Sequence, residues 1–145
     1  MKRMAGPYYV DGDQSLGDSD IIDCNVPPDG QPGLHCSWEP SSNGEHIIWD
    51  GTEKFYYAPE WMAYIVNHFL KPDCEVSKLV EDVKLPHPFL GFTFNHMLNG
   101  EIEAQGEDPD DRWKLIVENN TVYVANGILE YGPPQEIIPG TGLNY

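Results

Sequence analysis

Positively charged residues are scarce in this chain. It has 8 lysines and arginines against 24 aspartates and glutamates, so its formal net charge is −16 over 145 residues. Proteins bind bare nucleic acid by neutralising phosphates with lysine and arginine, and direct nucleic-acid binding is therefore not expected. A surface of this sign keeps a protein soluble and favours encounters with basic molecules. We expect any macromolecular partner to be a basic protein.

Long apolar runs and paired cysteines are also lacking. The mean hydropathy is −0.46, and no run approaches the roughly 18 apolar residues of a membrane span, so no membrane association is expected. Lys2 and Arg3 are not followed by an apolar region, and no secretory signal is predicted. Cys24, Cys36 and Cys74 are odd in number and have no CxxC spacing, which argues against a disulfide framework or a zinc finger. These features indicate a protein of a reducing cytoplasm.

Common catalytic motifs are missing as well. The chain has no GxxxxGK[ST] phosphate loop, no GxSxG nucleophile elbow and no GxGxxG dinucleotide fingerprint. Its five histidines are scattered, and His68 falls on the apolar side of a predicted helix, where a core position is expected. Pairing of Cys74 with His87 or His96 as nucleophile and base would require an approach in the folded chain that the sequence does not indicate. We predict no cofactor and favour a non-enzymatic protein.

The distribution of proline, glycine and apolar residues divides the chain into three parts. Residues 1–33 have few large aliphatic side chains and many turn-forming residues, which predicts an irregular acidic arm with short strand or docking segments at residues 8–10 and 21–22. Residues 34–131 have the apolar periodicity of a single α+β domain. Residues 132–145 are rich in proline and glycine, which predicts an irregular tail.

Two helices are predicted in the middle of the chain. In residues 58–71, Trp61, Ile65 and Phe69 recur at helical spacing, with Pro59 in the first turn and Pro72 after the end. Residues 73–84 form a second apolar stripe, for which Asp73 is a suitable N-cap. We expect the first helix to pack on the sheet and the second to flank it.

Strand patterns and turn signals predict three hairpins. Asn-Gly and Asn-Asn pairs tolerate the positive φ angles of tight turns, and Leu115 and Val117 are expected to face Val122 and Val124. The predicted strand pairs are residues 34–38 with 46–50, 92–97 with 101–105 around Asn99-Gly100, and 113–118 with 121–125 around Asn119-Asn120, followed by an edge strand at 128–131. The fold expected is α+β, with a mostly antiparallel sheet of five to six strands.

Three short motifs resemble those of a group of small proteins from bacteriophages and prophages, especially of actinobacteria. The motifs are Gln31-Pro32-Gly33-Leu34-His35-Cys36-Ser37-Trp38, Trp49-Asp50-Gly51-Thr52-Glu53-Lys54-Phe55-Tyr56, and Leu98-Asn99-Gly100-Glu101-Ile102 followed by Gln105-Gly106-Glu107-Asp108-Pro109-Asp110-Asp111. The likeness covers about residues 31–124. The chain departs from the pattern at His35 and Ala104, where tryptophan is expected, and by an insertion at residues 73–91. The group has no assigned activity, so the resemblance implies a phage accessory protein and no mechanism.

Carboxylates and aromatic residues form the candidate binding surface. Six carboxylates lie between Glu101 and Asp111, and Arg112 and Trp113 follow them directly. Trp113, with the neighbouring pair Tyr56-Tyr57, is a candidate for an exposed anchor, because tryptophan, tyrosine and arginine dominate interface hot spots, whereas Trp38, Trp49 and Trp61 are expected in the core. The residues predicted to contact a partner are Tyr56, Tyr57, Glu101, Glu103, Glu107, Asp108, Asp110, Asp111, Arg112 and Trp113.

Several functions fit this surface. The first hypothesis is a non-enzymatic protein that binds a basic host protein in the host cytoplasm, with nucleic-acid mimicry or inhibition as one form of it. The second is a small hydrolase or nuclease that uses Asp108, Asp110 and Asp111 with a divalent ion, although no EF-hand spacing is present and no metal site is predicted. The third is a minor component of the virion.

Overall fold

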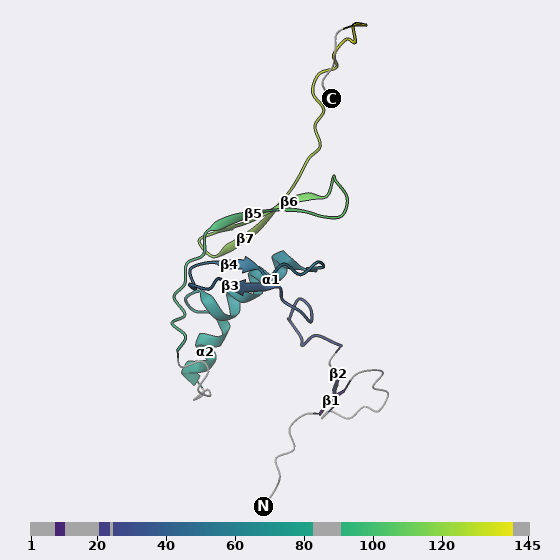
Figure 1. Cartoon of the computed structure of the whole chain (residues 1–145). Coiled ribbons are helices and arrows are strands. Elements are labelled where there is room, and N and C mark those ends of the chain that lie inside the picture. The colour runs from purple at the N-terminus through teal and green to yellow at the C-terminus, as the bar shows by residue number, and fades with distance from the viewer. Residues whose placement is uncertain (1–7, 11–20, 24, 83–90, 141–145) are drawn as a thin grey trace, which may run out of the picture.

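The computed structural model describes residues 8–10, 21–23, 25–82 and 91–140 of the chain, and they form an α+β fold (Figure 1). The strands belong to three separate sheets. They are the parallel pair β1 (Tyr8–Val10) and β2 (Ile21–Asp23), the antiparallel pair β3 (Trp38–Pro40) and β4 (Ile47–Trp49), and the antiparallel sheet β5 (Gly100–Gln105), β6 (Arg112–Glu118) and β7 (Thr121–Asn126). The α+β class is confirmed, but the prediction of one sheet of five to six strands with two helices on it is wrong.

The β5-β6-β7 sheet contains the best-predicted part of the fold. Leu115 lies opposite Val124, and Val117 lies opposite Val122, so the expected cross-strand pairs are confirmed. The turn at Asn119 and Asn120 has φ angles of 47° and 67°, which asparagine tolerates better than most residues. Because side chains alternate across a strand, Leu115 and Val117 point to one face and become buried there.

The predicted hairpin around residues 40–44 is present but short. Trp38 pairs with Trp49 and Pro40 pairs with Ile47, whereas residues 34–37 do not belong to the strand. The Ser41 N–H donates to the His46 carbonyl, and Gly44 takes the positive φ that the turn requires. The hairpin packs through Trp38 and Ile47 against the main core.

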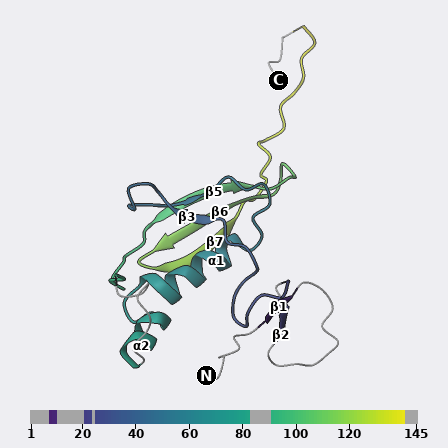
Figure 2. The same ribbon diagram turned by 60° about the horizontal axis from the view of Figure 1, so that its bottom comes forward.

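The helix predicted over residues 58–71 changes its winding halfway. α1 (Ala58–Ile65) is a regular helix, and the π-helix η1 (Val66–Leu70) continues it and ends with the Lys71 N–H donating to the Val66 carbonyl. Figure 2 shows α1 lying along one face of the β5-β6-β7 sheet. Met62 and Val66 of this helix form the core together with Leu115 and Val117.

The second predicted helix begins later than expected and does not flank the sheet. α2 (Glu75–Asp82) begins two residues after Asp73 and packs against η1. Asp73 itself has a φ of 57°. Cys74, directly before the helix, and Val76 within it are buried. The predicted end of this helix at residues 83–84 lies outside the described residues.

Asn99-Gly100 is not the turn of a hairpin. Residues 92–99 are irregular, and β5 pairs with β6 instead of with residues 92–97. The side chain of Asn120 holds this segment in place: its Oδ1 accepts from the Leu98 N–H at 2.7 Å, and its Nδ2 donates to the His96 carbonyl at 2.9 Å. These bonds to the β6–β7 turn replace the ladder that the Asn-Gly motif predicted.

The edge strand predicted at residues 128–131 is also absent. β7 ends at Asn126, and residues 127–138 have no regular secondary structure. Figure 1 shows this part of the chain running away from the sheet as an extended tail. We refer to residues 127–140 as the C-terminal tail.

Candidate functional site

The acidic residues predicted to bind a partner lie on one hairpin. Glu101 and Glu103 are exposed on the outer face of β5, opposite the face that covers the core. Glu103 lies beside Lys114, which also approaches Glu101 at 3.4 Å, and Gln105 lies beside Arg112. Basic side chains therefore offset the strand carboxylates locally.

The carboxylates in the loop between β5 and β6 are less offset by basic side chains than those on the strand are. Glu107, Asp108, Asp110 and Asp111 are all exposed. The loop is closed by its backbone, because the Gly106 N–H donates to the Asp111 carbonyl at 2.7 Å and the Asp111 N–H donates to the Asp108 carbonyl at 3.0 Å. We refer to residues 106–111 as the acidic loop.

These carboxylates do not form a metal centre. Nowhere in the described part of the chain do three or more histidine, cysteine or carboxylate side chains converge so that they could hold a metal ion. The Asp111 side chain lies against Gly106, where it occupies the space that a Cβ atom would fill. The geometry therefore gives no support to metal-assisted hydrolysis by Asp108, Asp110 and Asp111.

The aromatic candidates lie in different places. Tyr56 and Tyr57 are 68% and 58% exposed, as expected, and Tyr57 lines a shallow hollow of about 450 Å³ together with Tyr64 and His68. Trp113 was expected as an exposed anchor, but it points to the inner face of the sheet and packs against the core, because alternation along β6 places it on the same face as Leu115.

The other tryptophans also differ from one another. Trp61 is buried, and Trp38 is half-buried with its Nε1 donating to the Ala58 carbonyl at 2.8 Å. Trp49 was expected in the core but is half exposed, because it lies at the end of the short β4 strand and its Nε1 donates to the Thr52 carbonyl. His68 is half-buried rather than in the core, stacked on Tyr64 at 3.8 Å between ring centroids.

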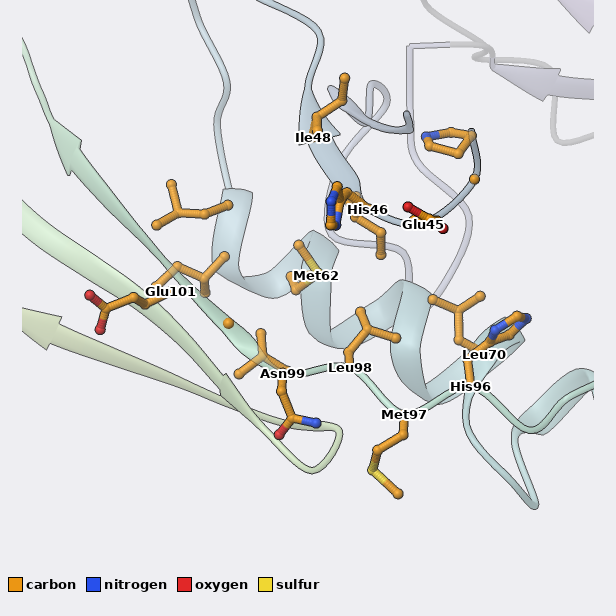
Figure 3. A pocket seen from close by; sticks show the side chains of 17 residues that line it. Glu45, His46, Ile48, Met62, Leu70, His96, Met97, Leu98, Asn99 and Glu101 are labelled. Carbon is orange, nitrogen blue, oxygen red and sulfur yellow. The ribbon is translucent and has the colours of Figure 1, made fainter. Parts of the chain in front are cut away.

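A second hollow, wider than the one at Tyr57, lies between the β3–β4 hairpin and β5. It has a volume of about 660 Å³. Its floor includes Met62, Leu115 and Val117, and its walls include Ile48, Met97 and Ile102. Figure 3 shows Met62 of α1 between Ile48 on one side and the chain from Met97 to Glu101 on the other. We call this hollow the β4–β5 groove.

An open sheet edge borders this groove. The strand order is β5-β6-β7, so among the described residues β5 pairs on one side only, and β4 pairs only with β3. Every second N–H and C=O of such an edge strand points away from its partner and is available to another extended chain. The β4–β5 groove thus combines an apolar floor with backbone hydrogen-bonding groups, the arrangement by which proteins bind extended segments.

The pKa values of two groups beside the β3–β4 hairpin are shifted from their ordinary values. Burial raises the pKa of the Cys36 thiol, and the nearby negative charge of Asp50 raises it further. The hydrogen bond from this thiol to the Trp38 backbone acts in the opposite direction but does not cancel the rise. Hydrogen bonds from Thr52 and Ser37 lower the pKa of Asp50, and the Thr52 N–H donates to Asp50 Oδ1 at 2.8 Å. A raised thiol pKa means less thiolate, so Cys36 is not an activated nucleophile.

No protein-family model, curated protein or solved structure matches this chain. Within the described residues, no helix is long and apolar enough to cross a membrane.

The groove was not predicted from the sequence. Its residues come from the β3–β4 hairpin, the helix, the segment before β5 and two strands of the sheet. The one local signal is the apolar pair Met97-Leu98 directly before Asn99-Gly100, of which Met97 is predicted as the last residue of a strand over residues 92–97. Met97 is 60% exposed at the groove wall.

Proposed function

We propose that this protein is a non-catalytic binding protein that engages a basic partner protein through its acidic loop. The observation that carries the proposal is the placement of Glu107, Asp108, Asp110 and Asp111 in an exposed loop closed by its own backbone bonds. A loop held in this way presents its charges with little further loss of conformational freedom on binding. Such charges accelerate encounter with a basic surface and select against acidic ones.

The strand carboxylates extend this surface. Glu101 and Glu103 lie on the outer face of the strand that leads into the acidic loop. Their attraction for a partner is reduced by Lys114 and Arg112 on the neighbouring strand. We therefore assign the main contact to the loop and a supporting contact to the strand.

The resemblance to phage and prophage proteins supports a host protein as the partner and the host cytoplasm as the place of action. A partner that itself binds nucleic acid would make the acidic loop a mimic of a phosphate backbone. The same experiment separates the two forms of the proposal, because a mimic is displaced by DNA and an ordinary protein ligand is not.

The test compares two variants of equal charge. The first removes three of the four carboxylates of the acidic loop with Glu107→Gln, Asp108→Asn and Asp110→Asn. The second removes three exposed charges elsewhere with Glu39→Gln, Glu53→Gln and Glu118→Gln. A partner captured from an actinobacterial lysate is purified and titrated against both at low and high salt. We expect the loop variant to bind about tenfold or more weakly and with a shallower salt dependence, and the matched variant to bind like the unaltered protein. Equal binding by both variants would contradict the assignment to the loop.

A further inference from the structure

The C-terminal tail carries apolar side chains that the body of the protein does not cover. Ile128, Leu129 and Tyr131 are 91%, 61% and 84% exposed. They lie in a stretch without regular secondary structure. Paired as a β-strand, this stretch would place Leu129 and Tyr131 on one face and Ile128 on the other. Exposed apolar side chains that lie close together mark interaction sites.

The tail leaves the sheet from the β7 edge, whereas the β4–β5 groove of the same copy lies at the β5 edge. The Gly127 N–H donates to the Arg112 carbonyl at 2.6 Å, which ties the first residue of the tail to the start of β6. The tail continues from β7, and the open edge at the groove belongs to β5, on the opposite side of the sheet. Figures 1 and 2 both show the tail directed away from the body.

The two uncovered features have complementary chemistry. The β4–β5 groove offers an apolar floor at Met62 and Leu115 and a free strand edge at β5. The tail offers extended backbone with apolar side chains on alternate positions, which is what a free edge above an apolar groove accepts. Pro133 and Pro134 lack the N–H needed for a ladder, so the segment able to pair ends at Gly132.

We propose that the C-terminal tail of one copy of this protein adds as a strand to β5 of a second copy, with Leu129 and Tyr131 in the β4–β5 groove. Each copy has both a tail and a groove, so the contact is head-to-tail and leads to rings or chains of copies. The copies repel one another through their like charge, and added salt screens that repulsion. Self-association therefore strengthens with salt, whereas binding of a basic partner by the acidic loop weakens with it.

The test measures the molar mass of the full chain by sedimentation over a range of concentrations. We expect the mass of the unaltered protein to rise above that of the monomer with concentration, and to rise further with NaCl. Leu129→Asp in the tail and Met97→Asp in the groove should each leave a monomer. Tyr123→Asp, which adds the same charge at an exposed position on the outer face of the sheet, should associate like the unaltered protein.

Mixing the two defective variants gives the decisive result. The Leu129→Asp copy retains a groove and the Met97→Asp copy retains a tail, so the mixture should form a dimer that grows no further. A mixture that stays monomeric would overturn the proposal, and so would an unaltered protein that remains a monomer at all concentrations and salts. The loop variant with Glu107→Gln, Asp108→Asn and Asp110→Asn should still associate, so failure of the proposed function and failure of this inference are distinguishable.

Discussion

Asn120 connects the β6–β7 turn to the segment of residues 96–98 through one side chain. It occupies the β6–β7 turn with a φ of 67°, and its amide binds both the Leu98 N–H and the His96 carbonyl. Residues 96–98 form a wall of the β4–β5 groove. The shape of the groove therefore depends on a residue that does not line it.

Replacing Asn120 by alanine should destabilise the protein by about 2–3 kcal/mol, because two hydrogen bonds of about 1 kcal/mol each are lost and alanine resists a positive φ. Urea unfolding followed by tryptophan fluorescence measures the loss. Asn120→Gly removes the same amide but accepts the backbone conformation, so its loss should be smaller. Unchanged stability in Asn120→Ala would show that the amide does not hold residues 96–98.

Asp50 should contribute stability that depends on pH. Hydrogen bonds from Thr52 and Ser37 lower its pKa in the folded protein, below the value of about 3.9 for an unfolded aspartate. A group with a lowered folded pKa stabilises the fold above its unfolded pKa, and this contribution is lost as pH falls through the folded pKa. We expect Asp50→Asn to lower Tm at pH 7, and the difference from the unaltered protein to disappear as the pH falls below about 3.9.

Thermal unfolding at a series of pH values checks this expectation. Glu53→Gln removes a charge from the same exposed loop and serves as the control, which should not reproduce the loss at pH 7. If the Tm difference for Asp50→Asn stays constant down to acid pH, the hydrogen bonds from Thr52 and Ser37 do not stabilise the ionised form of Asp50.

At the scale of elements, the junction between β7 and the C-terminal tail packs closely against the start of β6. A Cβ atom at Gly127 would lie 2.8 Å from the Arg112 carbonyl oxygen and 3.1 Å from the Arg112 Cβ. Both belong to β6, whose backbone is held by ladders on both sides. Neither atom can move away without disturbing those ladders.

Gly127→Ala should therefore destabilise the protein by about 1–3 kcal/mol, as overpacking in a close contact does. Gly132→Ala is the matched control, because a Cβ there meets nothing within 4 Å, and it should leave stability unchanged. The two variants are compared by urea unfolding. Equal stability of both would mean that the end of β7 is not fixed by this contact.

The elements predicted correctly from the sequence are those specified by their own residues. The β6–β7 hairpin combines a turn that accepts positive φ with alternating apolar residues on both strands, and both signals lie within 14 residues. The Asn99-Gly100 turn had the same local signal, yet residues 96–98 bind to Asn120 instead. A sequence pattern could not reveal that competition, since its outcome depends on a residue more than 20 positions away.

The candidate site shows the same limit. The exposed position of the acidic loop follows from its composition, because ionised carboxylates are costly to bury. The inward orientation of Trp113 follows from the pleat of β6, because Trp113 shares the face of Leu115 and Val117 in the strand predicted over residues 113–118. The β4–β5 groove required knowledge of how two separate sheets lie beside one helix, and no local pattern in the sequence contains that information.

At the scale of the whole molecule, charge repulsion should oppose folding. The formal net charge is −16, and within the described residues two ion pairs are present, Lys78 with Glu75 at 4.0 Å and Lys114 with Glu101 at 3.4 Å. Both are exposed, and pairs of this kind contribute about 0–1 kcal/mol. Screening by salt therefore removes more repulsion between carboxylates than attraction within these pairs.

We expect Tm to rise between about 50 mM and about 500 mM NaCl, as the screening length shortens to a few ångströms. The measurement uses the Leu129→Asp variant at low protein concentration, so that association of copies does not add to the effect. The variant with Glu107→Gln, Asp108→Asn and Asp110→Asn should show a smaller rise, because part of the repulsion originates in the acidic loop. A Tm that falls with NaCl would mean that attractive ion pairs outweigh repulsion, and the acidic loop would then be compensated within the fold and less available to a basic partner.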